Sequence, residues 1–104
     1  MDNLFTLDDS NRGALMLSQA MLGAVSANFR MVALTKNESS WQLKFYLEAE
    51  SVEDREEIQE VAEEFEALQA IAIHYEVDIV VTKNEIKWPE LPTRVVFRRR
   101  EAIN

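Results

Sequence analysis

The strongest pattern of apolar and polar positions in the chain is helical and lies in residues 51–72. Apolar side chains recur there at three- and four-residue intervals, which places them on one face of an α-helix. They are Ile58, Val61, Ala62, Phe65, Leu68 and Ala72. Ser51 is a favourable N-cap, and Asp54 follows three residues later in the position of a capping box. The sequence therefore predicts an amphipathic helix that begins after Ser51.

An earlier helical pattern begins at Ser10, which is also a favourable N-cap. The residues at helical spacing after it are Ala14, Leu17, Met21 and Val25, and Leu15 and Leu22 widen the same face. Residues 13–29 carry no charge and include only four polar residues among seventeen, so we expect this helix to lie beneath other elements.

The same uncharged stretch has some features of a targeting segment, because it ends in the signal-peptidase-like run Ala24-Val25-Ser26-Ala27. A secretory signal has a positive leader, and a membrane span needs about 20 mainly apolar residues. The leader here carries three aspartates against one arginine, and the stretch is interrupted by polar residues. We therefore predict a buried helix in a cytoplasmic protein.

Four segments have the composition of β-strands, namely residues 30–36, 41–48, 74–82 and 93–100. The second alternates apolar and polar residues, which is typical of a strand with one buried face. A polar link at residues 37–40 favours an antiparallel hairpin between the first two segments. Two prolines between the last two segments indicate a longer loop, because proline cannot donate a hydrogen bond to a strand ladder.

The elements follow the order α-β-β-α-β-β. The most direct packing of this order is a two-layer α+β fold, in which two helices pack on one face of a four-stranded antiparallel sheet. We expect residues 1–104 to form a single domain. Thr35-Lys36-Asn37-Glu38-x-x-Trp41 recurs 47 positions later as Thr82-Lys83-Asn84-Glu85-x-x-Trp88. Two αββ halves at about 10–48 and 51–100 are one interpretation, and chance reuse of turn-forming residues is the other.

The negative charge of the chain is concentrated in the second predicted helix. The 104 residues include 11 Lys and Arg against 19 Asp and Glu, a formal charge of −8, and eight of the acids lie between Glu53 and Glu66. Glu56, Glu60 and Glu63 point away from the apolar stripe, and Glu53, Glu57 and Glu64 flank it. Such a face either is solvated or meets a positively charged partner, which would relieve the repulsion between neighbouring glutamates. The acidity argues against sequence-independent binding of nucleic acid.

Residues suited to catalysis or metal binding are scarce. The chain has no cysteine, which excludes disulfides, thiolate zinc sites and cysteine nucleophiles. His74 is the only histidine and has no companion at metal-ligand spacing, so we expect it to be structural. Two glycines are too few for a phosphate-binding loop. We predict a protein that is not an enzyme and has neither cofactor nor metal; a small carboxylate enzyme is the alternative.

Two further features could serve either a partner or the fold. Trp88 precedes Pro89 in the predicted loop, where an exposed indole would be a binding anchor and a buried one would fill the core. Arg98-Arg99-Arg100 is the single basic cluster. Strand side chains alternate between faces, so we expect Arg98 and Arg100 to form salt bridges with acidic neighbours or to protect an edge strand from aggregation.

Several stretches resemble small bacterial immunity proteins of contact-dependent growth inhibition and related polymorphic toxin systems. They are Leu22-Gly23, Asn28-Phe29-Arg30-Met31-Val32, Glu53-Asp54-Arg55-Glu56-Glu57-Ile58, Glu64-Phe65-Glu66-Ala67-Leu68-Gln69, Trp88-Pro89 and Arg94-Val95-Val96-Phe97-Arg98-Arg99. None of them is a catalytic signature. The resemblance implies a protein that binds one toxin domain and blocks it without doing chemistry.

Charge and resemblance together give one hypothesis, because an acidic protein can be steered into the basic substrate groove of a nuclease toxin. The predicted partner-binding residues are Glu53, Glu56, Glu60, Glu63, Glu64 and Trp88. The partner is a cognate basic toxin domain, with no role for nucleic acid or membrane. The alternative is a self-associating structural or regulatory module, in which a second copy covers the sheet face opposite the helices around Tyr46 and Val80.

Overall fold

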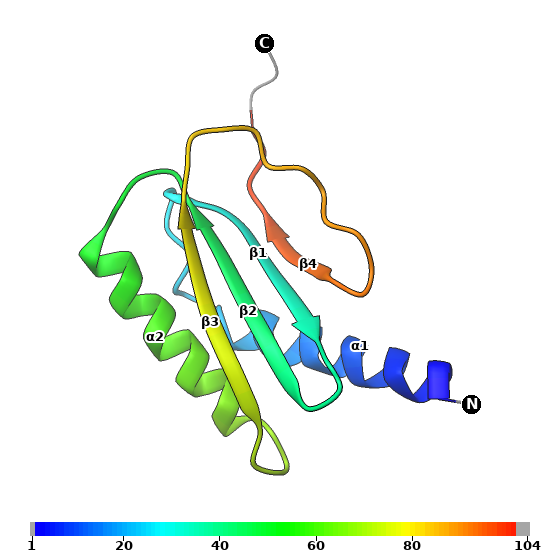
Figure 1. Cartoon of the computed structure of the whole chain (residues 1–104). Coiled ribbons are helices and arrows are strands. Elements are labelled where there is room, and N and C mark those ends of the chain that lie inside the picture. Colours follow the sequence, from blue (N-terminus) through cyan, green and yellow to red (C-terminus); the bar gives the residue numbers. More distant parts are fainter. Residues whose placement is uncertain (1, 102–104) are drawn as a thin grey trace.

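The computed structural model describes the backbone of residues 2–101 and the side chains of residues 9–101. Two helices and four strands follow one another in the predicted order (Figure 1). They are α1 (Asp2–Ala20), β1 (Phe29–Lys36), β2 (Ser40–Leu47), α2 (Val52–Ala67), β3 (His74–Val81) and β4 (Arg94–Arg98). The α+β class and the α-β-β-α-β-β order are confirmed.

The sheet is mixed, so the prediction of a wholly antiparallel sheet is wrong. Its strand order is β3-β2-β1-β4; β1 is antiparallel to both of its neighbours, whereas β3 is parallel to β2. The length of α2 explains this direction. Its 16 residues span about 24 Å, and the eight residues of β2 span about 26 Å. The helix therefore returns the chain along the whole of β2, and β3 starts beside Ser40 and runs the same way.

Both helices cover one face of the sheet, as predicted. Ile58, Val61, Ala62 and Phe65 of α2, Leu17 of α1 and Met21 just after α1 pack into one core with the inward residues of the central strands. Those strand residues are Phe29, Val32, Leu34, Trp41, Leu43, Phe45 and Leu47. Edge-to-face contacts of Trp41 with Phe65 and of Phe29 with Phe45 join the elements, with ring centroids 5.5 and 6.4 Å apart.

The predicted loop between β3 and β4 carries the chain from one edge of the sheet to the other (Figure 1). On the way Ile86 becomes buried against Met31 and Ala33, which point from β1 to the side opposite the helices. This small second core, with Tyr46 and Val95 packed against it, covers part of the face that a second copy would cover in the alternative interpretation.

The predicted start and facing of α1 are wrong. The helix begins at Asp2, so Ser10 lies within it and is buried instead of capping its first turn. It ends at Ala20, which leaves Met21, Leu22 and Val25 outside it. Leu15 and Leu22 are 72% and 79% exposed, because α1 and the turn after it meet the core along the narrow stripe of Leu17 and Met21. An uncharged stretch was thus mistaken for a wide buried face.

The N-terminal cap of α2 is confirmed, because the Ser51 hydroxyl accepts a 3.0 Å hydrogen bond from the Asp54 backbone N–H. The Asp54 carboxylate is buried and accepts hydrogen bonds from the Ser26 hydroxyl and the Asn28 side-chain amide. The cap therefore also fixes the link between α1 and β1 to the start of α2.

The two similar sequence segments have different structures. Residues 35–41 form the turn of the β1–β2 hairpin, and Trp41 is buried in the core. Residues 82–88 begin the loop across the sheet, and Trp88 is 64% exposed. The repeated letters thus do not correspond to a repeated conformation.

Candidate functional site

The outer face of α2 carries the glutamates that the sequence suggested as contacts. Glu53, Glu56, Glu60, Glu63 and Glu64 are all exposed, while the opposite side of the helix is buried. The buried apolar residues are Ile58, Val61, Ala62 and Phe65; the predicted stripe extended too far, because α2 ends at Ala67, Leu68 is half-buried and Ala72 is exposed. We call the five glutamates the acidic face. The structure brings them together because helical spacing places all five outside the stripe that binds the sheet.

The acidic face accounts for most of the unbalanced charge of the molecule. Residues 50–66 hold nine acidic residues and one arginine, a net charge of −8, so the remaining ten acids and ten bases of the chain cancel. Among the side chains of residues 9–101, no lysine or arginine forms a salt bridge with any of the five glutamates. Arg55, the only base in the segment, pairs with Glu50 instead.

A groove of about 470 Å³ lies at the N-terminal end of the acidic face. Glu53, Glu56 and Glu57 line it from α2, and residues 23–26 line it from the α1–β1 link. The Asp54 hydrogen bonds described above hold that link in place. The groove thus presents carboxylates beside an apolar wall that includes Val25.

The C-terminal half of α2 lies close to the start of β3. The Tyr75 hydroxyl donates a 3.2 Å hydrogen bond to Glu66, and Glu63 is near enough to act on Tyr75 electrostatically. Burial, followed by the hydrogen bond to Glu66, raises the pKa of Tyr75. The acidic charge of α2 therefore reaches the edge of the sheet.

Trp88 is exposed, but the structure does not bring it together with the acidic face. It lies in the loop whose Ile86 packs on the sheet face opposite the helices. The Arg98 guanidinium lies 5.6 Å from the centre of the Trp88 ring and donates to the Ile86 carbonyl. The path of a loop after a strand is set by tertiary packing, so sequence spacing could not place this tryptophan.

The basic cluster forms salt bridges through Arg99, whereas the sequence suggested Arg98 and Arg100. Arg99 contacts Glu48 at 2.9 Å and Glu101 at 3.1 Å. Arg98 stacks on Trp88, and Arg100 is exposed. The prediction extended the strand to residue 100, but β4 ends at Arg98, and the assumed alternation ends with it.

A buried ion pair that sequence reasoning missed ties down the C-terminal segment. Arg30 is only 5% exposed, and its guanidinium donates two hydrogen bonds to Glu101, at 2.7 and 2.8 Å. It also donates to the carbonyls of Thr82 and Asn84 at the start of the loop. The hydrogen bond from Arg30 is the main reason that the pKa of Glu101 falls to about 2. The only sign of this ion pair in the sequence is the position of Arg30 within the apolar run of β1.

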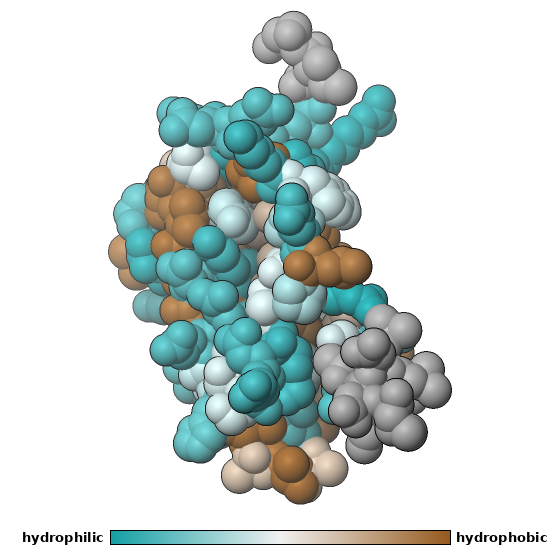
Figure 2. Space-filling view, turned by 45° about the vertical axis from the view of Figure 1, so that its right-hand side comes forward, coloured by the Kyte–Doolittle hydropathy of each residue, from teal (hydrophilic) through white to brown (hydrophobic). Residues whose placement is uncertain are grey.

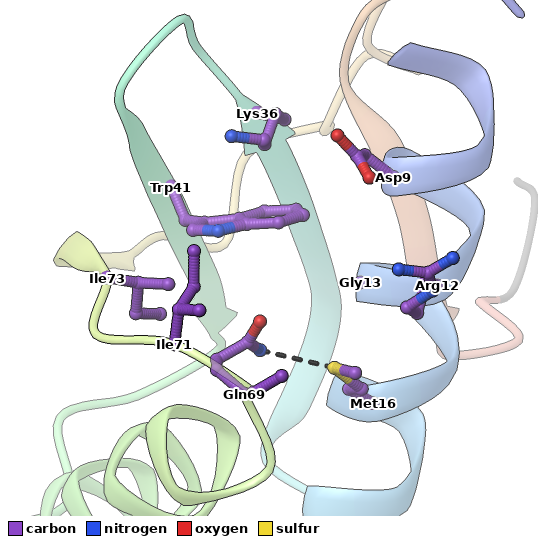
Figure 3. Close-up of a pocket in the computed structure, with 10 residues that line it drawn as sticks. Asp9, Arg12, Gly13, Met16, Lys36, Trp41, Gln69, Ile71 and Ile73 are labelled. Atoms are coloured by element: carbon purple, nitrogen blue, oxygen red, sulfur yellow. Dashed lines mark hydrogen bonds between the residues drawn. The ribbon is translucent and has the colours of Figure 1, made fainter. Parts of the chain in front are cut away.

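A pocket of about 260 Å³ opens between α1, the β1–β2 hairpin and the link from α2 to β3 (Figure 3). The Trp41 indole lies at its centre, and the Lys36 ammonium is 5.0 Å from the ring. A hydrogen bond from the Gln69 amide to the Met16 sulfur closes one end. Asp9 and Arg12 line it from α1, and its ten lining residues include no serine, cysteine or histidine.

The family model of the MafI2 immunity protein matches residues 11–101. The chain belongs to the MafI2 immunity protein family. The match spans nearly all of the described structure, from the middle of α1 to Glu101. A search of curated proteins finds no match.

Membership of the MafI2 immunity protein family confirms the resemblance to small bacterial immunity proteins of polymorphic toxin systems. It implies a toxin protein as the partner, and immunity proteins of this kind are generally not catalysts. His74 is exposed at the start of β3, and residues 9–101 hold no group of three His, Cys, Asp or Glu side chains suited to a metal. No helix in the described part of the chain has the length and apolarity to cross a membrane.

Proposed function

We propose that this immunity protein neutralises its toxin by binding it non-catalytically through the acidic face of α2, and that the toxin is a nuclease whose basic substrate groove receives this face. The observation that carries the proposal is the placement of charge. A net −8 lies in residues 50–66, and the five exposed glutamates have no salt-bridge partner among the described side chains.

Two physical effects support binding of a basic partner at this face. Neighbouring glutamates three or four positions apart, such as Glu56 and Glu60, repel each other by about 0.2 to 0.5 kcal/mol per pair. Cations from a partner would remove that repulsion. Concentrated charge also accelerates encounter by roughly 10- to 1,000-fold at low salt, which suits a protein that must intercept a toxin quickly.

Trp88 is left out of the proposed interface. It lies with Ile86 on the other side of the sheet, so a toxin seated on α2 would not reach it. The six residues suggested by the sequence are thereby reduced to the five glutamates.

The direct test reverses three charges of the acidic face. The variant Glu56→Lys, Glu60→Lys, Glu63→Lys is mixed in a stopped-flow instrument with an inactive form of the cognate toxin domain. We expect association about tenfold or more slower at low salt, with a weaker dependence on salt than the unaltered chain shows.

The matched control makes the same change in net charge elsewhere. Glu38, Glu85 and Glu90 are exposed and lie outside α2, so their triple reversal to Lys also moves the formal charge from −8 to −2. We expect a much smaller loss of rate in this control. Equal rates in the two variants would show that net charge alone matters, and an unchanged rate in the first would remove α2 from the mechanism. The proposal that the toxin is a nuclease is tested separately, by incubating the active toxin with DNA and RNA and measuring cleavage.

A further inference from the structure

The two edges of the sheet differ in how well they are protected. At one edge β4 is only five residues long, pairs with β1 through an irregular register and carries two arginines. Charges and irregularity of this kind discourage another strand from adding to an edge. At the other edge β3 has eight residues in unbroken register with β2, and it contains no proline, glycine, lysine or arginine. No strand of the described chain lies beyond it (Figure 1).

The outward backbone groups of β3 can be assigned from the ladder. The Thr82 N–H donates a 2.9 Å hydrogen bond to the Leu47 carbonyl of β2. The backbone N–H and C=O groups of successive residues point to alternate sides of a strand, so those of the even-numbered residues in this segment point towards β2. The N–H and C=O groups of Tyr75, Val77, Ile79 and Val81 therefore point away from the sheet, ready to pair with an added strand.

The side chains at this edge have two distinct characters. On the helix side, Val77 and Val81 are 37% and 39% exposed. On the other side stand Glu76 and Asp78, of which Asp78 has Lys44 at 3.8 Å. The edge thus offers alternating apolar and acidic positions along one strand.

Hydrophilic residues dominate much of the surface seen in Figure 2, with apolar patches between them. Exposed valines at regular spacing along an edge strand indicate a binding site for a peptide strand more specifically than such scattered patches do. The reason is that the same strand also offers unpaired backbone groups.

We propose that the outer edge of β3 receives a β-strand of the toxin, in which apolar residues alternate with lysine or arginine. The inference rests on the proposed function, since it names a second part of the same toxin interface. The apolar residues would cover Val77 and Val81, and the cations would meet Glu76 and Asp78. At the start of β3, Glu63 and Glu66 of α2 extend the acidic surface beside Tyr75, so the edge continues the acidic side of the molecule.

Two central registers for a second copy on the same edge would bring like charges together. Centring a twofold antiparallel pair of β3 strands on Val77 places Glu76 opposite Asp78 of the other copy. Centring the pair on Asp78 places the two Asp78 side chains opposite each other. Like charges directly across a strand pair destabilise it, whereas lysines or arginines at these positions would stabilise it.

Hydrogen exchange of the full chain, alone and bound to the inactive toxin domain, tests the proposal. In the complex, the amides of Val77 and Ile79 should exchange at least about tenfold more slowly, whereas the amides of Glu76 and Val80, which already face β2, should change much less.

A pair of variants tests the same hydrogen bonds by affinity. Val77→Pro removes an outward N–H without removing a hydrogen bond to β2, since proline is tolerated where the donor faces solvent. Val77→Ala shortens the side chain and keeps the N–H. We expect the proline variant to bind the toxin about tenfold more weakly than the alanine variant.

The outcomes separate this inference from the proposed function. If the toxin binds but the Val77 and Ile79 amides exchange as fast as in the free chain, the added strand is refuted, while the acidic face can still be the contact. If the unaltered chain does not bind the toxin, both proposals are wrong. The exchange measurement on the unaltered chain decides the matter even if Val77→Pro does not fold.

Discussion

The ion pair between Arg30 and Glu101 leads us to predict how the stability of the protein depends on pH. Replacing Glu101 with glutamine keeps the size of the side chain and removes its charge. Arg30 is 5% exposed, so it would keep its charge in a buried site whose remaining acceptors are all neutral, namely the glutamine side-chain carbonyl and the backbone carbonyls of Thr82 and Asn84. A buried arginine that loses its carboxylate is strongly destabilising, because desolvation of the cation is no longer offset.

The size of the effect follows from the pKa of Glu101, which is about 2 in the folded protein against an ordinary value of 4.5. Each tenfold change in proton affinity is worth about 1.36 kcal/mol, so the full difference corresponds to roughly 3 kcal/mol. The Glu101 side chain is 24% exposed, and water screens part of the interaction. We expect Glu101→Gln to lower the free energy of unfolding by about 2 kcal/mol at pH 7.

The lowered pKa also fixes the pH range in which this stabilisation disappears. The carboxylate favours the folded state fully above pH 4.5, and the benefit is lost as the pH falls towards about 2, where folded Glu101 takes up a proton. Urea unfolding of both proteins from pH 7 to pH 2.5 should show two curves that converge on acidification. A difference that is negligible at pH 7, or that stays constant down to pH 2.5, would refute the reasoning.

The exposed pair of Glu50 and Arg55 is the matched control for this experiment. Its atoms approach as closely as those of the buried pair, but both side chains are more than two-fifths exposed. Surface pairs contribute little because water screens them. Glu50→Gln should therefore change the unfolding free energy much less than Glu101→Gln does.

Three further substitutions test the packing and the site. Gly13→Ala should destabilise the protein by about 1 to 2 kcal/mol in thermal unfolding although alanine favours helix, because the new Cβ would overlap the Trp41 ring; a gain in stability would show that the ring moves freely. Ser51→Ala should cost about 1 kcal/mol through loss of the hydrogen bond to the Asp54 N–H, measured by urea unfolding, and an unchanged midpoint would contradict the capping role. Trp88→Ala should change the Kd for the toxin less than about twofold in calorimetry, since the ring lies across the sheet from α2; a tenfold loss would return Trp88 to the interface.

Local patterns were sufficient for much of the fold and for part of the candidate site. The 3.6-residue period of α2, its Ser51 cap and the alternation in β2 depend on neighbours within a few residues, so they can be read from the chain directly. The same period places the five glutamates on the exposed side of α2. The polar turn at residues 37–40 likewise predicted the antiparallel β1–β2 hairpin.

Features that depend on distant parts of the chain could not be read in this way. Apolar and polar side chains alternate along a strand in the same way whether its neighbour is parallel or antiparallel. The alternation in β3 therefore could not give its direction, which follows from the way α2 returns the chain along β2. The apolar width of α1 was overestimated, because composition does not tell which side chains meet the sheet. Arg30 and Glu101 are 71 positions apart, beyond any local pattern.

The amino-acid sequence by itself determined the helix with its concentrated negative charge, the order of the elements and the membership of an immunity protein family. Only the tertiary structure decided that β3 is a free edge beside that charge, that Trp88 lies on the opposite side, and that a buried arginine holds the C-terminal segment. The physical reason is the range of the interactions. Periodicity and capping act over one or two turns of chain, whereas strand order and ion pairing depend on which distant segments the core brings together.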